Sequence, residues 1–427
     1  MKITDEEILA YHEGGKIGTE LKKPCDTQRN LSIAYTPGVG LPCKKIEQDP
    51  SLAYKYTAKG NTVAVISDGT AVLGLGDIGA LASKPVMEGK VVLFKKFANL
   101  DGVDIEINEK DPKKIVDICV AISTSFGGIN LEDIKAPKCF EIEKELQDRV
   151  NIPVMHDDQH GTAIITTAGL INAAELNKKD LKSMKIVIIG AGAAAISCGR
   201  MYKKLGVNNI WMVDSKGIVS NKRDDLNVYK KEFIVETDKT TLADALKDAD
   251  MLVGLSTAGV VSKEMIASMA KNPIIFTLAN PVPEILPEEI KEVRDDAIIG
   301  TGRSDYPNQI NNVLGFPFIF RGALDVRAKK ITENMKMAAA NALASLAKEP
   351  IPYYVKAAYN DTTLCYGKEH IIPKPFNKEV QIWVSSAVAE AAIEDGVTDI
   401  KDFDIEAYRK HLRSTIYLDE NSKEFKK

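Results

Sequence analysis

The sequence lacks the patterns that several large protein classes require. No apolar run approaches the roughly 20 residues that cross a bilayer, so no membrane association is expected. The six cysteines are scattered without a CxxC pair, and neither a disulfide framework nor a thiolate zinc site is expected. A formal net charge of -4 provides no electrostatic attraction to nucleic acid. The N-terminal segment MKITDEEILAYHEGG predicts no signal or transit peptide, and reduced cysteines make the cytoplasm the expected location.

The composition and length predict a globular protein of two domains. The chain has 427 residues, of which 44% are hydrophobic and 27% charged. From Lys185 onward, apolar strands alternate with amphipathic segments, which predicts a doubly wound parallel sheet of Rossmann type. We therefore expect an α/β fold with a mixed N-terminal domain (1–160), a Rossmann-type domain (161–385) and a helical C-terminal segment (386–427).

The N-terminal half offers weaker local signals. NTVAVISDGTAVLG predicts two strands joined by a DG turn, and KVVLFKKF and VDIEI predict two more. DIGALASKPVMEG is typical of a short helix, and GGINLEDIKAP of a glycine-led loop. The small-residue run after IPVM predicts a helix packed closely between other elements.

Two glycine-rich turns are candidates for a phosphate-binding loop. Gly74-Leu-Gly76-Asp-Ile-Gly79 fits the sequence pattern, but two lysines stand where an acid that binds ribose should end the next strand. The turn GAGAAA at 190–195 follows the strand KIVII, precedes a helix, and has Asp214 at the end of the next strand. We predict that the coenzyme is bound by Gly190, Gly192, Ala193, Ala195 and Asp214.

Asp214 also favours one coenzyme over the other. Its carboxylate could accept a hydrogen bond from the ribose 2′-hydroxyl of NAD and would repel the 2′-phosphate of NADP. Lys216 and Arg223 lie just beyond it and could offset that repulsion. NAD is therefore expected, with NADP possible.

The stretch VMHDDQHGTA places Asp157 and Asp158 between His156 and His160. A solvated turn is the simplest interpretation, and a zinc site of HExxH type would need both histidines on a helix, whereas a strand precedes them. Together with the pair Glu132-Asp133 on another connection, the aspartates could instead bind a hard divalent cation such as Mg²⁺ or Mn²⁺. Spacing alone leaves these alternatives open.

Several motifs, in order, resemble those of the short bacterial-type malic enzymes. They are SIAYTPGVG (32–40), AVISDGTAVLGLGDIGALASKPVMEGK (64–90), GGINLEDIKAPKCFEIE (127–143), PVMHDDQHGTAI (153–164), GAGAAAIS (190–197), TLANPVPEI (277–285) and NNVLGFPFIFRGALD (311–325). The resemblance implies that Glu132, Asp133 and Asp158 are metal ligands. It implies a catalytic Tyr35 and Lys90, with Asp157 as a carboxylate that either supports the neighbouring metal ligand or relays a proton. By the same resemblance, Asn280 would face nicotinamide and substrate, and so would Asn312.

The resemblance implies oxidative decarboxylation of (S)-malate to pyruvate and CO₂, in a homodimer or higher oligomer. Lys90, with a pKa lowered by the cation and by burial, would act as the base, and Tyr35 would protonate the enolate. Ala71 stands where longer animal malic enzymes carry a substrate-binding arginine, as in other short members. An oxaloacetate decarboxylase that does not use the nucleotide, and an NAD-sensing module, are the alternatives. Neither histidine is given a catalytic role, since capping and polar packing explain both.

Overall fold

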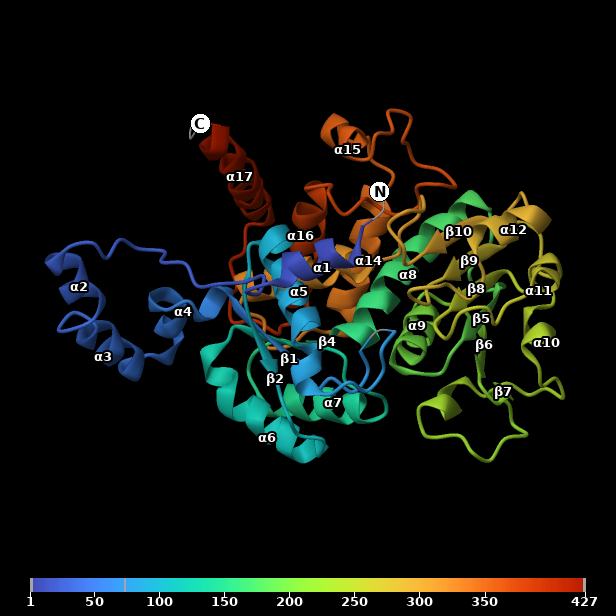
Figure 1. Ribbon diagram of the computed structural model, residues 1–427, viewed down its shortest axis with the longest axis horizontal. Coiled ribbons are helices and arrows are strands. Elements are labelled where there is room, and N and C mark those ends of the chain that lie inside the picture. Colours follow the sequence, from blue (N-terminus) through green and yellow to red (C-terminus); the bar gives the residue numbers. More distant parts are fainter. Residues whose placement is uncertain (1–2, 73, 425–427) are drawn as a thin grey trace.

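The computed structural model describes residues 3–72 and 74–424, which fold around two sheets (Figure 1). The first sheet is parallel, in the order β2-β1-β3-β4, and comprises β1 (Thr62–Ser67), β2 (Asp101–Glu106), β3 (Gly128–Leu131) and β4 (Val154–His156). The second has the order β10-β9-β8-β5-β6-β7 and comprises β5 (Lys185–Ile189), β6 (Asn209–Asp214), β7 (Gly217–Ile218), β8 (Met251–Gly254), β9 (Ile274–Thr277) and β10 (Ile298–Thr301). Its described pairs are parallel except β6–β7. The predicted α/β architecture with a Rossmann-type sheet is confirmed.

Helices cover the sheets, and the middle residues of the central strands β1 and β5 are apolar. Residues 63–66 of β1 and 186–188 of β5 are fully buried. The first sheet packs against α5 (Ala80–Ala98) and α7 (Lys138–Arg149), and α6 (Pro112–Ile122) packs against α7. The small-residue helix is confirmed as α8 (Asp157–Leu176), which packs between α9 (Ala193–Lys204) and α14 (Glu333–Leu346). At Gly169 a Cβ would lie 2.9 Å from the Phe276 ring, which explains the small residue there.

Three local predictions in the N-terminal half are wrong. KVVLFKKF is not a strand but the second half of α5, because Met87, Val91, Phe94 and Ala98 recur at helical spacing and bury one face. The strand expected after the DG turn is absent from the described residues, which have only an isolated bridge between Val72 and Gly76 there. The expected glycine-led loop is β3 over residues 128–131, because pairing between β1 and β4 buries it.

Residues 28–56 form an arm rather than a layer of the domain. The arm contains α2 (Gln28–Ala34), α3 (Gly40–Gln48) and α4 (Ala53–Tyr56), and none of these helices has a buried residue. The helix α1 (Asp5–His12) also has no buried residue, but the segment after it contacts α5, where Lys16 N donates to Glu88 at 2.9 Å. In Figure 1 the helices α2 and α3 stand on the far left, well away from the sheets. Large apolar side chains of the arm are exposed, including Leu31, Ile33, Tyr35 and Leu41.

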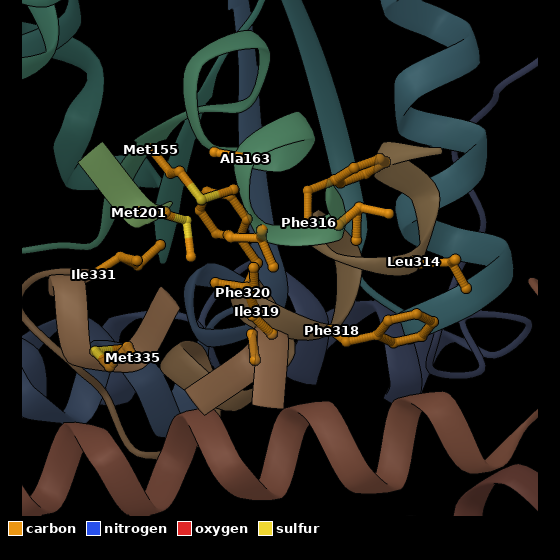
Figure 2. Close-up of a cluster of buried hydrophobic side chains, with 14 of the residues drawn as sticks. Met155, Ala163, Met201, Leu314, Phe316, Phe318, Ile319, Phe320, Ile331 and Met335 are labelled. Atoms are coloured by element: carbon orange, nitrogen blue, oxygen red, sulfur yellow. The ribbon is translucent and has the colours of Figure 1, made fainter. Parts of the chain in front are cut away.

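The C-terminal helices pack back onto the N-terminal half. They are α13 (Phe316–Asp325), α14, α15 (Tyr353–Ala358), α16 (Glu379–Glu394) and α17 (Ile405–Glu424). Phe316 and Phe320 of α13 meet the Phe94 ring of α5 edge-on, at centroid distances of 4.8 and 5.4 Å. Figure 2 shows Phe316 and Phe320 among Met155, Ala163 and Met335 in one buried cluster. No helix in the described ranges is both long and apolar enough to cross a membrane.

Candidate active site

The acidic residues meet at the carboxyl edge of the first sheet. Glu132 and Asp133 follow β3, and Asp157 and Asp158 follow β4, with Leu131 paired to His156. Because neighbouring parallel strands end at the same edge, the register brings the two acidic pairs together. The backbone N–H of Asp133, which has a φ of 55°, donates to Asp158 Oδ2 at 2.7 Å.

Glu132, Asp133 and Asp158 form a group that fits a divalent cation. Each offers an oxygen, and these oxygens all lie within 4.8 Å of one another. Burial, with the charge of Asp158, raises the pKa of Asp133 to about 8, and burial also raises the pKa of Glu132 well above its ordinary value. Asp133 Oδ2 is buried without a hydrogen-bond partner in the described part of the chain. Three crowded carboxylates, one of which has an unpartnered buried oxygen, provide the hard ligands that Mg²⁺ or Mn²⁺ prefers.

Lys90 lies beside this group, on the face of α5 that packs toward the sheet edge. Its Nζ is 2.7 Å from Asp157 Oδ2 and 2.8 Å from Glu132 Oε1, and it lies over the Phe316 ring at 4.2 Å. Burial by itself lowers the pKa of Lys90, but the charges of Asp157 and Glu132 outweigh it and raise this pKa above its ordinary value. The expectation of a lowered Lys90 pKa is therefore wrong, because the neighbouring carboxylates of the protein favour the protonated amine.

Asn312 and Gly161 complete the surroundings of Asp157. Asn312 Nδ2 donates to Asp157 Oδ2 at 3.2 Å, and its Oδ1 accepts from Thr162 at 3.1 Å. A Cβ at Gly161 would lie only 2.2 Å from Asp157 Oδ1, so any side chain there would displace the carboxylate. Gly161 was not predicted as a site residue. A glycine is required there because of its contact with Asp157 in the folded protein, and not because of its backbone conformation.

His156 and His160, which flank the two aspartates, both have structural partners. His156 is fully buried, caps α8, and accepts the backbone N–H of Gln159 on its side chain. His160 Nε2 lies 2.9 Å from Glu143 Oε2. Neither belongs to the candidate metal group, and the predicted roles in capping and polar packing are confirmed.

The GAGAAA turn has the geometry of a phosphate-binding loop. Gly190 directly follows β5 and has a φ of 113°, and a Cβ there would lie 2.5 Å from the Leu255 carbonyl oxygen. Gly192 precedes α9, which begins at Ala193, and a Cβ on Gly192 would meet open space. Ala195 is buried at the helix–sheet contact. The amides at the start of α9 are thus open to an anion at the carboxyl edge of the second sheet.

Asp214 lies at the end of β6 as predicted, but its carboxylate is fully engaged. Oδ1 accepts from Lys216 N (2.9 Å) and Arg223 Nη1 (2.7 Å), while Oδ2 accepts from Arg223 Nη2 (3.0 Å) and Lys230 Nζ (2.5 Å). Burial opposes ionisation, but these donors hold the pKa of Asp214 at about 2. A carboxylate offers about four acceptor positions, and all four are used.

Two predicted residues lie apart from the carboxylates. Asn280 follows β9, donates to the Leu278 carbonyl at 3.2 Å, and has the Gly74 turn beside its backbone. Tyr35 ends α2 in the N-terminal arm and is 70% exposed. Within one chain, α2, which Tyr35 follows, stands well to the left of α5, the helix that contains Lys90 (Figure 1).

Two models of known protein families match long segments of the chain. The family described as "Malic enzyme, N-terminal domain" matches residues 14–147, and "Malic enzyme, NAD binding domain" matches residues 159–354. The chain belongs to the malic enzyme family. The family predicted from the motifs is thus confirmed, and the reaction of malic enzymes is the oxidative decarboxylation of malate.

Individual malic enzymes are similar over most of the chain. The NADP-dependent malic enzyme of Halomonas elongata is 55% identical, covering 92% of this chain and 94% of that protein. The NAD-dependent malic enzyme of Rhizobium meliloti is 49% identical over 97% of this chain, which spans only 54% of that protein. The chain spans about half the length of most of the curated relatives that it matches. The crystal structure of malic enzyme from Pyrococcus horikoshii Ot3 has a TM-score of 0.88 and 44% identity, covering 97% of this chain and 96% of that one.

Proposed function

We propose that the chain oxidises and decarboxylates (S)-malate to pyruvate and CO₂, with reduction of NAD or NADP and a bound Mg²⁺ or Mn²⁺. The observation that carries the proposal is the convergence of Lys90 with Glu132, Asp133, Asp157 and Asp158 at one sheet edge. The 1–160 region would then supply the catalytic groups and the 161–385 region the coenzyme cleft. The cytoplasmic location stays a prediction.

Each group of the chain has a definable task in this reaction. Glu132, Asp133 and Asp158 would hold the cation, which when bound lowers the pKa of the substrate hydroxyl and stabilises the negative charge that decarboxylation creates. Lys90 would exchange a proton with the substrate oxygen, and Asp157, 2.7 Å from its Nζ, would hold the ammonium in place and relay that proton. Asn312 fixes the orientation of Asp157.

The role of Tyr35 requires a second copy of the chain. The proposed task of Tyr35 is to donate a proton to the enolate carbon, yet its side chain is 70% exposed at the end of α2, which stands away from α5, the helix of Lys90 (Figure 1). The exposed apolar residues around it, among them Leu31 and Ile33, would be covered if the arm packed on another molecule. We propose a homodimer in which each arm supplies Tyr35 to the partner's site.

The contacts of Asp214 support NADP over NAD, in place of the preference predicted from the sequence. With its four acceptor positions filled, Asp214 cannot accept from a ribose 2′-hydroxyl. Arg223 and Lys230 cancel its charge, so a 2′-phosphate nearby would meet cations rather than an open carboxylate. Asn280 remains the candidate to face the nicotinamide.

A spectrophotometric assay tests the proposal. The purified chain is mixed with (S)-malate, Mn²⁺ and either NADP⁺ or NAD⁺, and the nicotinamide absorbance is followed with and without a chelator. We expect coenzyme reduction that the chelator abolishes. Loss of CO₂ from oxaloacetate, without any oxidation of malate, would instead support the decarboxylase alternative.

A further inference from the structure

The buried carboxylate of Glu143 contacts both ends of the first turn of α8, which contains Asp157 and Asp158. Glu143 of α7 accepts the backbone N–H of His156 on Oε1 at 2.9 Å, and its Oε2 lies 2.9 Å from His160 Nε2. Glu143 is only 6% exposed. Because His156 and His160 flank the two aspartates, these bonds fix the turn relative to α7.

A buried lysine supports the same network from α14. Lys336 is 3% exposed, and its Nζ lies 3.1 Å from Nδ1 and 3.2 Å from Nε2 of His160, and 2.7 Å from Glu333 Oε1. Because an ionised Glu143 carboxylate can only accept, His160 donates to it from Nε2. Burial opposes the charge of Glu143, but His160 and Lys336 hold its pKa at about 2.

The network reaches Asp158 through the ring of His156. His156 accepts from Gln159 on Nδ1, so its proton is on Nε2, which lies 3.5 Å from Asp158 Oδ2. That Nε2 is buried and has no hydrogen-bond partner in the described ranges. The Oδ2 atom of Asp158 therefore accepts from the Asp133 amide and lies close to this ring without a hydrogen bond to it.

We propose that Glu143 is a positioning residue for the cation site and that Lys336 supports it from α14. The inference rests on the proposed function, because it takes Glu132, Asp133 and Asp158 as the ligands. These carboxylates repel one another, and a turn free to relax would move Asp158 away from the other two. Glu143 prevents this movement, so the ligands are already in place when the cation arrives.

Mn²⁺ binding to the full chain, without malate or coenzyme, tests the inference directly. Free Mn²⁺ is measured by electron paramagnetic resonance during a titration. Glu143→Gln keeps the side-chain size but removes the charge and one acceptor oxygen, and we expect it to raise the Kd for Mn²⁺ by roughly 10- to 100-fold. Lys336→Met should also raise the Kd for Mn²⁺. If Glu143→Gln does not fold, Lys336→Met is the variant that tests the inference.

Asp250→Asn is a matched control for a purely structural effect. Asp250, like Glu143, accepts a backbone N–H (Lys185, 2.9 Å) and a side-chain donor (Lys179 Nζ, 2.6 Å). It precedes β8, at the opposite end of the strands from the coenzyme cleft. We expect this variant to lose thermal stability without a change in the Kd for Mn²⁺.

The possible failures are distinguishable. If the unmodified chain does not bind Mn²⁺, or if Asp158→Asn binds it equally well, the proposed metal site and the role of Glu143 fail together. If the unmodified chain binds Mn²⁺ through Asp158, but folded Glu143→Gln and Lys336→Met bind it with unchanged Kd, only the positioning role is overturned. An equal loss of Mn²⁺ affinity in Asp250→Asn would overturn it as well.

Discussion

The Nζ atom of Lys90 lies 2.7 Å from Oδ2 of Asp157, and both side chains are almost completely shielded from solvent. A buried ammonium beside a buried carboxylate is costly to separate, because removing either partner leaves an unpaired charge in a low-dielectric site. In this protein the pair adjoins the proposed cation ligands, so its charge state bears on the reaction as well as on stability.

Replacing Lys90 should remove most of the catalytic rate. A positioned acid–base group contributes about 10²- to 10⁴-fold, so Lys90→Met is expected to lower kcat by that factor. Lys90→Arg keeps the charge near Asp157 but cannot release its proton near neutral pH, and a similar loss of kcat is expected. Steady-state kinetics with saturating malate and coenzyme measure both. Full activity in Lys90→Arg would show that only the charge matters.

Asp158→Asn should separate metal binding from coenzyme binding. The substitution removes a charged ligand oxygen while leaving the GAGAAA turn untouched, so turnover is expected to disappear and the Kd for the coenzyme to change less than about threefold. Calorimetric titration with NADP⁺ and the malate assay provide the two values. Retained turnover would mean that Asp158 is not a ligand.

Two inactive variants should complement each other if Tyr35 acts across a dimer. Tyr35→Phe and Lys90→Met are unfolded together and refolded as a mixture. Half of the dimers should then contain one site with both native residues, which predicts about a quarter of the unmodified activity in a C₂ dimer. Each variant refolded alone is the control. No recovery in the mixture would indicate that Tyr35 acts within its own chain or has no role.

Lys230→Met should reduce the discrimination between NADP and NAD. Losing one charge-assisted contact near Asp214 is worth about 1.5–3 kcal/mol, so binding of adenosine 2′,5′-bisphosphate is expected to weaken about tenfold or more while AMP binding stays unchanged. Lys222→Met is the control, since Lys222 is paired with Asp238 and largely exposed. If Lys230→Met weakens the binding of adenosine 2′,5′-bisphosphate and of AMP equally, the 2′-phosphate does not bind beside Lys230.

His370 should make the protein less stable in mild acid. Burial, with the charge of Lys374, lowers its pKa from 6.5 to about 4. Between these values the unfolded chain binds a proton that the folded chain does not, so stability falls as pH decreases from about 6.5 to 4, by at most about 3 kcal/mol.

Urea unfolding at pH 7 and pH 4.5 measures this effect. We expect the loss of unfolding free energy between the two values to be smaller in His370→Gln than in the unmodified chain, because glutamine does not titrate. His411→Gln, at an exposed position, should leave that loss unchanged. An identical loss in His370→Gln would contradict the assignment.

The sequence by itself determined the features that depend on short-range patterns. The strand–turn–helix at 185–204 follows from apolar periodicity and from Gly190, whose positive φ other residues rarely adopt. The acidic pairs could be placed after strands or helices, and their chemistry suggested a cation, because carboxylates keep their preference for hard ions in any fold. The motif order was sufficient to name the family.

Tertiary structure decided everything that depends on which groups are buried together. KVVLFKKF became helical because its Val91 and Phe94 face a core that includes α13, from more than 200 residues later. The direction of the Lys90 pKa, the filled acceptors of Asp214 and the bonds from Glu143 to both histidines all arise from contacts between separate elements. Such contacts leave no local pattern, because electrostatic energy depends on distance and burial in space rather than on separation along the chain.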